Sequence, residues 1–141
     1  MKCQDIMKTH VQWCHEMDSV AVVAARMREE GIGFMPVCDV DGALRGTVTD
    51  RDLTIRVLAL GRPLDTPVRS VMSHGVITCN AEDDLGRAEA LMARYRKSRM
   101  VCADDLGHPL GVISLSDIAE VEHSRRASRI FKAVAAREAR T

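Results

Sequence analysis

The chain has 141 residues, of which 46% are hydrophobic and 3% are aromatic, and its formal net charge is zero. These values fit a compact globular protein with an aliphatic core and exclude wholesale disorder. Five cysteines, an odd number with no C-x-x-C pair and no preceding signal peptide, predict reduced thiols in the cytoplasm. No apolar run approaches the roughly 20 residues that a membrane-spanning helix needs.

The charges are unevenly distributed. Six of the 20 basic residues but only one of the 20 acidic residues lie in 123–141, so this tail carries +5 and the rest of the chain −5. An acidic body is a poor surface for a polyanion, which disfavours nucleic-acid binding by the main fold.

An internal repeat organises the chain. At an offset of 65 residues, residues 6–53 align with residues 71–118 without a gap, and eleven of the 48 pairs are identical. This self-similarity predicts a duplication. We therefore expect domains at 1–62 and 69–122, a linker at 63–68 that contains Pro63 and Pro67, and a basic helical tail at 123–141.

Each copy predicts the order strand, helix, strand, strand, helix. A short strand at 11–14 or 76–79 precedes an N-cap at Asp18 or Asp83 and a helix of about 12 residues. Hairpins follow at 34–48 and 100–113, with glycine in the turn. Second helices begin at Asp50, running to Leu60, and at Leu115. The fold class is α+β, with two pseudo-twofold-related copies packed sheet to sheet because one copy alone has too small a core.

The sharpest local pattern joins the third strand to the second helix. Both copies read Gly, two residues, Ser or Thr, two residues, Asp: Gly46–Thr49–Asp52 and Gly111–Ser114–Asp117. A hydroxyl at a helix N-terminus favours phosphate, and a carboxylate three positions later can accept both hydroxyls of a ribose. One turn of helix would then bind the sugar and the phosphate of a nucleotide together.

The same spacing is also that of a capping box, which needs no ligand. Two details favour a ligand site. A capping box prefers Glu or Gln where both copies have Asp, and the glycine in each motif leaves room for a close neighbour.

With the segment Gly31–Val37 and the repeat, these junctions make the chain resemble a tandem CBS-domain pair, or Bateman module, over residues 3 to about 122. The resemblance implies regulatory binding of AMP, ADP or ATP, less often of S-adenosylmethionine or NAD, in the cleft between copies. It places Asp52 and Asp117 on ribose, Thr49 and Ser114 on ribose or phosphate, and Gly33, Phe34, Ser98 and Arg99 beside the base or phosphates. Arg51 and Ser116, inside the same motifs, complete the predicted set.

The two copies differ at the predicted site. Trp13 corresponds to Thr78, and Pro36 to Val101. The indole either fills the adenine pocket or stacks on the base, and the two sites are not expected to be equivalent.

No catalytic or metal-binding motif is found. G-x-S-x-G, H-E-x-x-H, P-loop and G-x-G-x-x-G patterns are absent, and the five histidines are scattered. We therefore expect no enzyme activity, no metal and no cofactor beyond the regulatory ligand.

The tail predicts a helix that continues the second helix from Asp117 through Ala139, with an apolar stripe of Ile130, Phe131, Val134 and Ala127. We expect the stripe to contact a partner or a second copy, the module to form a homodimer, and an effector protein to be regulated in trans. The alternatives are a structural dimerisation module with vestigial ligand sites, and a tail that docks on nucleic acid or an anionic membrane.

Overall fold

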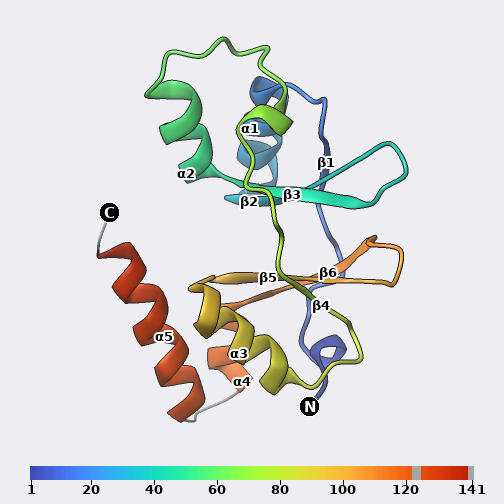
Figure 1. The fold of residues 1–141 in the computed structure, drawn as a ribbon, viewed down its shortest axis with the longest axis vertical. Coiled ribbons are helices and arrows are strands. Elements are labelled where there is room, and N and C mark those ends of the chain that lie inside the picture. The colour runs from blue at the N-terminus through green and yellow to red at the C-terminus, as the bar shows by residue number, and fades with distance from the viewer. Residues whose placement is uncertain (122–124, 140–141) are drawn as a thin grey trace. The chain divides into compact units, whose positions relative to one another are not determined.

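The computed structural model describes residues 1–121 and 125–139, and side chains within these ranges except at 125–128. The chain divides into two compact units (Figure 1). Unit 1 contains Met1–Val11 and Ile77–Thr141, and unit 2 contains Gln12–Val76. No described helix is both long enough and apolar enough to span a bilayer.

Unit 2 is a three-stranded sheet with its helices on one face (Figure 1). Strand β1 pairs in parallel with β2, which forms an antiparallel hairpin with β3. The elements are β1 (Cys14–His15), α1 (Val20–Glu30), β2 (Phe34–Cys38), β3 (Leu44–Thr49), α2 (Asp50–Leu53), the π-helical turn η2 (Thr54–Leu58) and the 3₁₀ turn η3 (Val68–Ser70).

Unit 1 repeats this arrangement with β4, β5 and β6 in the same order and directions. Its elements are η1 (Cys3–Asp5), β4 (Thr78–Cys79), α3 (Leu85–Tyr95), β5 (Arg99–Ala103), β6 (Pro109–Ser114), α4 (Leu115–Val121) and α5 (Arg125–Glu138). The predicted α+β class and the predicted strand and helix order are confirmed.

The hairpins form where the sequence predicts them. Gly42 and Gly107 have φ angles of 80° and 83°, a left-handed conformation that favours glycine in the turn. The strands before these turns are almost entirely buried except at their first residue, as the apolar runs Phe34–Cys38 and Met100–Ala103 require. Each sheet and its first helix therefore enclose one aliphatic core per unit.

The predicted N-caps are wrong by one residue. Ser19 caps α1 by accepting a hydrogen bond from the Val22 amide, and Asp84 caps α3 by accepting one from Gly86. Asp18 and Asp83 instead accept hydrogen bonds from the amides of His15 and Asn80, and so close the turns after β1 and β4. In each copy, adjacent polar residues divide these two tasks.

The segment at the N-terminal end of each sequence copy pairs with the third strand of the other copy. Lys8 forms an antiparallel bridge with Val112 of β6, and Ser73 forms the equivalent bridge with Thr47 of β3. In each bridge the two residues donate their amides to each other's carbonyl oxygen. The N–O distances are both 3.0 Å in unit 1, and 2.9 and 3.1 Å in unit 2. We call residues 3–8 and 68–73 the exchanged segments. Because of them, the compact units divide the chain differently from the contiguous domains 1–62 and 69–122.

The glycines of the two junction motifs are explained by these segments. A Cβ on Gly46 would lie 2.6 Å from both the Met72 sulfur and the Ser73 carbonyl oxygen. A Cβ on Gly111 would lie 2.6 Å from the Met7 sulfur. Glycine is thus needed so that an exchanged segment can pack against the third strand. The space that the glycine leaves is filled by this segment and not by a ligand.

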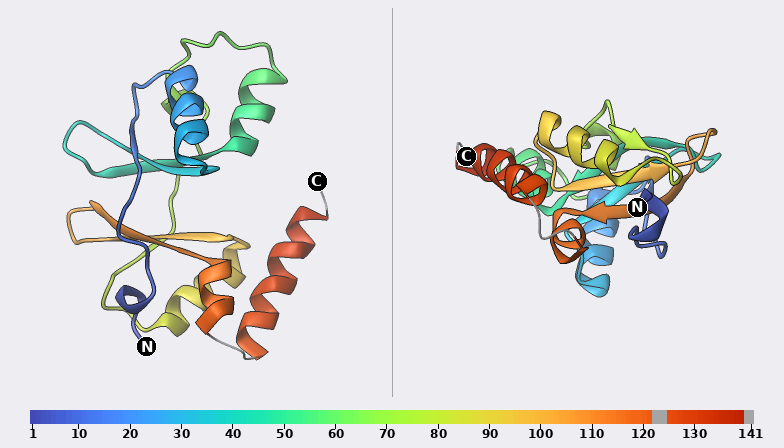
Figure 2. Two further views of the ribbon diagram at one scale, coloured as in Figure 1. Left: turned by 180° about the vertical axis from the view of Figure 1, so that it is seen from behind. Right: turned by 90° about the horizontal axis from the view of Figure 1, so that it is seen from below.

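The C-terminal region contains two helices, α4 and α5, where the sequence predicted one continuous helix from Asp117 to Ala139. Residues 122–124 lie outside the described residues, as does the side chain of Ala127. Helix α5 packs on α3 and α4 of its own unit (Figure 2). Ile130 and Val134 are 2% and 4% exposed there, whereas Phe131 remains 47% exposed. The prediction that the whole stripe meets a partner is therefore wrong for Ile130 and Val134, because unit 1 itself buries them.

Helix α3 ends on a strained residue. Gly31 and Arg96 occupy equivalent C-cap positions, both left-handed, with φ of 65° and 54°. Arg96 is the one non-glycine residue with positive φ in the described chain. Only glycine adopts this conformation without steric cost.

We expect Arg96→Gly to raise the free energy of unfolding by about 0.5 to 1 kcal/mol, because the relieved strain exceeds the entropy that glycine adds to the unfolded chain. Gly31→Ala is the matched control and should lower the free energy of unfolding by about 1 kcal/mol. No atom lies within 4 Å of the added Cβ, so the effect comes from backbone strain and not from a steric clash with a neighbour. Urea denaturation measures both. A less stable Arg96→Gly protein would contradict the strain argument.

Candidate functional site

The junction of unit 2 is a closed capping box. The Thr49 hydroxyl accepts a hydrogen bond from the Asp52 amide at 3.1 Å, and Asp52 Oδ2 accepts one from the Thr49 amide at 2.9 Å. The second carboxylate oxygen, Oδ1, lies 3.9 Å from Nε of Arg56. Arg56 is itself held by the carbonyl oxygens of Val71 and Met72, at the end of an exchanged segment.

The junction of unit 1 has the same geometry. Ser114 Oγ accepts from the Asp117 amide at 3.1 Å, and Asp117 Oδ2 accepts from the Ser114 amide at 2.9 Å. Here Oδ1 lies 3.6 Å from Nζ of Lys8, in the other exchanged segment. The shorter Asp side chain thus closes both capping boxes. The sequence argument that Asp in place of Glu or Gln favours a ligand site over a cap is therefore wrong.

The two carboxylates share a partly buried setting with one nearby cation. The side chains of Asp52 and Asp117 are 15% and 11% exposed, whereas Arg56 and Lys8 are 46% and 77% exposed. In both units one oxygen accepts a backbone hydrogen bond, and the other faces the solvent-exposed side chain of a cation. Such an oxygen can exchange its partner without breaking the cap.

The predicted turn residues lie beside these junctions. The Gly33 carbonyl oxygen accepts a hydrogen bond from the Asp50 amide at 3.0 Å, and Phe34 pairs with Thr49 across the hairpin. A Cβ on Gly33 would lie 2.8 Å from Oδ2 of the exposed Asp50 side chain, so a larger residue here would require that carboxylate to move. The start of β2 therefore lies against the start of α2.

The equivalent turn of unit 1 is more polar. The Ser98 carbonyl oxygen accepts from the Leu115 amide at 2.9 Å, and Arg99 pairs with Ser114 across the hairpin. The Arg99 side chain is exposed and donates to the Ser98 carbonyl oxygen at 3.2 Å. A guanidinium therefore stands where unit 2 has the half-buried ring of Phe34.

Of the remaining predicted residues, Arg51 and Ser116 are exposed on the first turns of α2 and α4. Trp13, just before β1, is 41% exposed. Each unit thus brings together a Ser or Thr, an Asp and two turn residues.

Two matches to the CBS domain family model cover residues 3–59 and 68–124. The chain belongs to the CBS domain family. The predicted tandem CBS pair is thereby confirmed, with both junction motifs inside the matched ranges.

Known CBS proteins resemble the chain along most of its length. The CBS domain-containing protein YhcV of Bacillus subtilis is 33% identical over 116 residues, which cover 82% of this chain and 81% of YhcV. Among solved structures, Hypoxic Response Protein I with two coordinated zinc ions is 26% identical, with a TM-score of 0.77 over 85% of this chain and 98% of that one. The CBS pair of MJ0100, in complex with 5′-methylthioadenosine and S-adenosyl-L-methionine, is 22% identical, with a TM-score of 0.77 over 86% and 94%. The last likeness supports the fold of the CBS pair.

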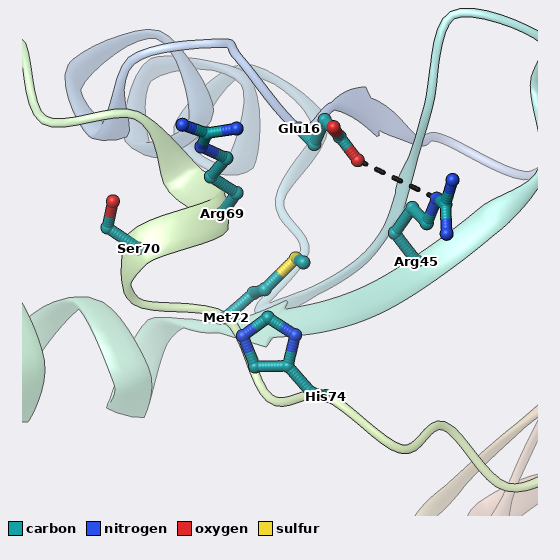
Figure 3. A pocket seen from close by; sticks show the side chains of 6 residues that line it. All are labelled: Glu16, Arg45, Arg69, Ser70, Met72 and His74. Carbon is teal, nitrogen blue, oxygen red and sulfur yellow. Dashed lines mark ion pairs between the residues drawn. The ribbon is translucent and has the colours of Figure 1, made fainter.

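A hollow of about 480 Å³ lies elsewhere on unit 2 (Figure 3). Its lining contains no predicted nucleotide-binding residue: Glu16, Arg45, Arg69, Ser70, Met72 and His74. Arg45 lies 3.9 Å from Glu16 and 3.1 Å from Asp39, so its charge is already balanced. The hollow is wide open and we assign it no ligand.

All five cysteines are buried and none forms a disulfide. Burial raises the pKa of Cys3 and of Cys14 to about 12 and that of Cys38 to about 11. These thiols stay protonated at neutral pH and are poor nucleophiles. The sequence missed one feature, the gathering of Cys3, Cys79 and Cys102 in one core, because their spacing matches no motif.

We expect Thr49→Ala and Ser114→Ala each to lower the free energy of unfolding of the ligand-free protein by about 0.5 to 2 kcal/mol, the usual cost of an N-cap. Ser116→Ala, at an exposed position of α4, is the control and should change it by less than about 0.5 kcal/mol. Chemical denaturation checks all three. Equal effects at Ser114 and Ser116 would show that the box contributes nothing.

Proposed function

We propose that this CBS pair is a regulatory module that binds an adenine nucleotide of the AMP, ADP or ATP type at its two junctions. The observation that carries the proposal is that only one oxygen of each junction carboxylate is bonded to the backbone. Asp52 and Asp117 each hold the backbone with Oδ2 and turn Oδ1 toward an exposed cation. A ribose diol can replace this weak, solvent-screened ion pair as the partner of Oδ1.

The setting of each carboxylate suits a nucleoside. The backbone amides of Thr49 and Ser114 donate to the Asp side chains and hold them in place, so that little conformational entropy is lost on binding. The exposed Arg99 supplies a planar guanidinium that can bind a phosphate with two parallel hydrogen bonds. The adenosine ligands of the MJ0100 pair support adenosine as the common part of the ligand.

The proposed role is sensing without catalysis. The junction carboxylates each hold a helix cap through one oxygen, and the buried thiols of Cys3, Cys14 and Cys38, elsewhere in the two units, remain protonated. Neither group resembles a nucleophile with its base. Binding would then be read by an effector protein in trans, from a homodimer in the cytoplasm.

A structural dimerisation module is the second candidate, and one observation favours it. Both capping boxes are complete without a ligand, so the fold does not need nucleotide to satisfy these groups. Exposed apolar residues on the helical face of unit 2, Ile55 at 45% and Leu58 at 77%, suit a subunit interface.

We expect an adenine nucleotide to raise the melting temperature. At about 100 times its dissociation constant, a ligand stabilises the native state by about 2.7 kcal/mol, which corresponds to about 5 to 10 °C for a protein of this size. A thermal-shift screen of AMP, ADP, ATP, S-adenosylmethionine and NAD measures this. Flat curves for all five at millimolar concentration would favour the structural module.

The variants Asp52→Glu and Asp117→Glu separate the ligand site from the cap. Glu closes a capping box, so the ligand-free proteins should melt within about a degree of the wild type. The extra methylene moves Oδ1, and losing a pair of charge-assisted hydrogen bonds should weaken nucleotide binding about 10- to 150-fold.

Titration calorimetry gives the affinity and stoichiometry for each variant and for the double variant. Because Arg99 lies in unit 1 and Phe34 is its counterpart in unit 2, we expect unequal losses. Unchanged affinity in both single variants would show that the carboxylates only cap helices.

A further inference from the structure

Three cysteine sulfurs meet in the core of unit 1. Cys79 Sγ lies 3.3 Å from Cys102 Sγ and 3.8 Å from Cys3 Sγ, and all three sulfurs lie within 4.8 Å of one another. They come from β4, β5 and the exchanged segment, respectively. All three residues are at most 4% exposed. We call this group the thiol triad.

The spacing of the triad is close to that of a three-coordinate metal–thiolate site. Three sulfurs bonded at about 2.3 Å to a metal in their plane lie about 4.0 Å apart. The Cys3–Cys79 distance of 3.8 Å already fits this value within about 0.2 Å. The Cys79–Cys102 pair would have to open by about 0.7 Å, a shift that side-chain rotation on adjacent parallel strands can provide.

The surroundings of the triad select the kind of ion. The triad belongs to an aliphatic core that includes Leu85, Met100 and Ile113, so a hard ion with water ligands does not suit it. Zinc almost always takes four ligands, whereas the triad offers three soft donors. Cu(I) is a soft ion that thiolates select.

The charge of such a site has one nearby compensation, the N-terminal end of α3, and one nearby opposing charge, the carboxylate of Asp83. Three thiolates and one Cu(I) carry −2, which is costly in an apolar core. Cys3 Sγ lies 3.9 Å from the carbonyl oxygen of Asp84, the N-cap of α3, so the triad lies beside the N-terminal end of that eleven-residue helix. The positive end of the helix dipole favours a negative group at this position.

Unit 2 shows that the fold itself does not require the triad. The positions that correspond to Cys3, Cys79 and Cys102 at the 65-residue offset are Val68, Cys14 and Val37. All three are at most 1% exposed in the core of unit 2, and Cys14 pairs with Val37 as Cys79 pairs with Cys102. Valine therefore fills the same place in the same fold, and the two additional cysteines of unit 1 are not dictated by packing.

We infer that the thiol triad of Cys3, Cys79 and Cys102 is a binding site for one Cu(I) ion. Coordination replaces the three S–H protons by the ion, and the protons pass to solvent. Because Cys3 belongs to an exchanged segment, the bound ion ties residues 3–8 to the sheet of unit 1. This site is independent of the nucleotide junctions, and neither proposal requires the other.

Titration of the full chain with Cu(I), delivered anaerobically with ascorbate as its bicinchoninate complex, tests the site. We expect transfer of one equivalent per chain, and X-ray absorption should show three sulfur neighbours at about 2.3 Å. Cys3→Val and Cys102→Val copy the residues of unit 2 and should keep the fold by circular dichroism. Removal of a ligand should weaken Cu(I) binding by more than the 10- to 100-fold that loss of an outer-shell partner costs.

Unit 2 provides the matched controls. Cys14→Ala and Cys38→Ala should leave the Cu(I) affinity unchanged, since neither residue belongs to the triad. The double variant Val37→Cys with Val68→Cys should build a second triad around Cys14 and raise the stoichiometry to two. The proposal is overturned if folded Cys3→Val and Cys102→Val bind Cu(I) like the wild type, or if the wild type binds Zn(II) and not Cu(I).

Discussion

Pairing between each exchanged segment and the third strand of the other copy is the contact on which both units depend. It places a Met side chain against a glycine in β3 and in β6, and it adds a two-hydrogen-bond bridge at the same point. It also brings the cation to each junction, Lys8 directly and Arg56 through the carbonyl oxygens of residues 71 and 72. The geometry of the candidate site therefore follows from this pairing as much as from the motif itself.

The junctions illustrate how one short motif serves two purposes. The Ser or Thr and one oxygen of the Asp stabilise the start of a helix, and the other oxygen remains next to a solvated cation. Because a cap is worth about 1 kcal/mol, the carboxylate is kept in position whether or not a ligand is present. Preorganisation of this kind lowers the cost of binding a small molecule.

The sequence predicted the hairpins, the helices and the junction motifs because each depends on local periodicity or on residues three apart. It could not assign the Gly46 contact with Met72, or the capping by Ser19 in place of Asp18, because these depend on atomic packing and on one-residue differences in backbone direction. The stripe at Ile130 and Val134 was read correctly as apolar, but periodicity does not say which surface covers it. The sequence did not predict the thiol triad for a related reason, because its three cysteines lie on separate segments that only the fold brings together.

The exchanged segments also bear on how such a chain folds and how it arose. Cys3 and Cys79 touch although 76 residues separate them, and closing so long a loop is slow compared with forming a hairpin. During synthesis, residues 3–8 must wait until β6 has left the ribosome before they can pair. In a single-copy ancestor with the same contacts, the leading segment of each chain would have had to pair with the third strand of a second chain, so that two chains exchanged segments. Duplication and fusion would then have turned a domain-swapped dimer into one covalent chain.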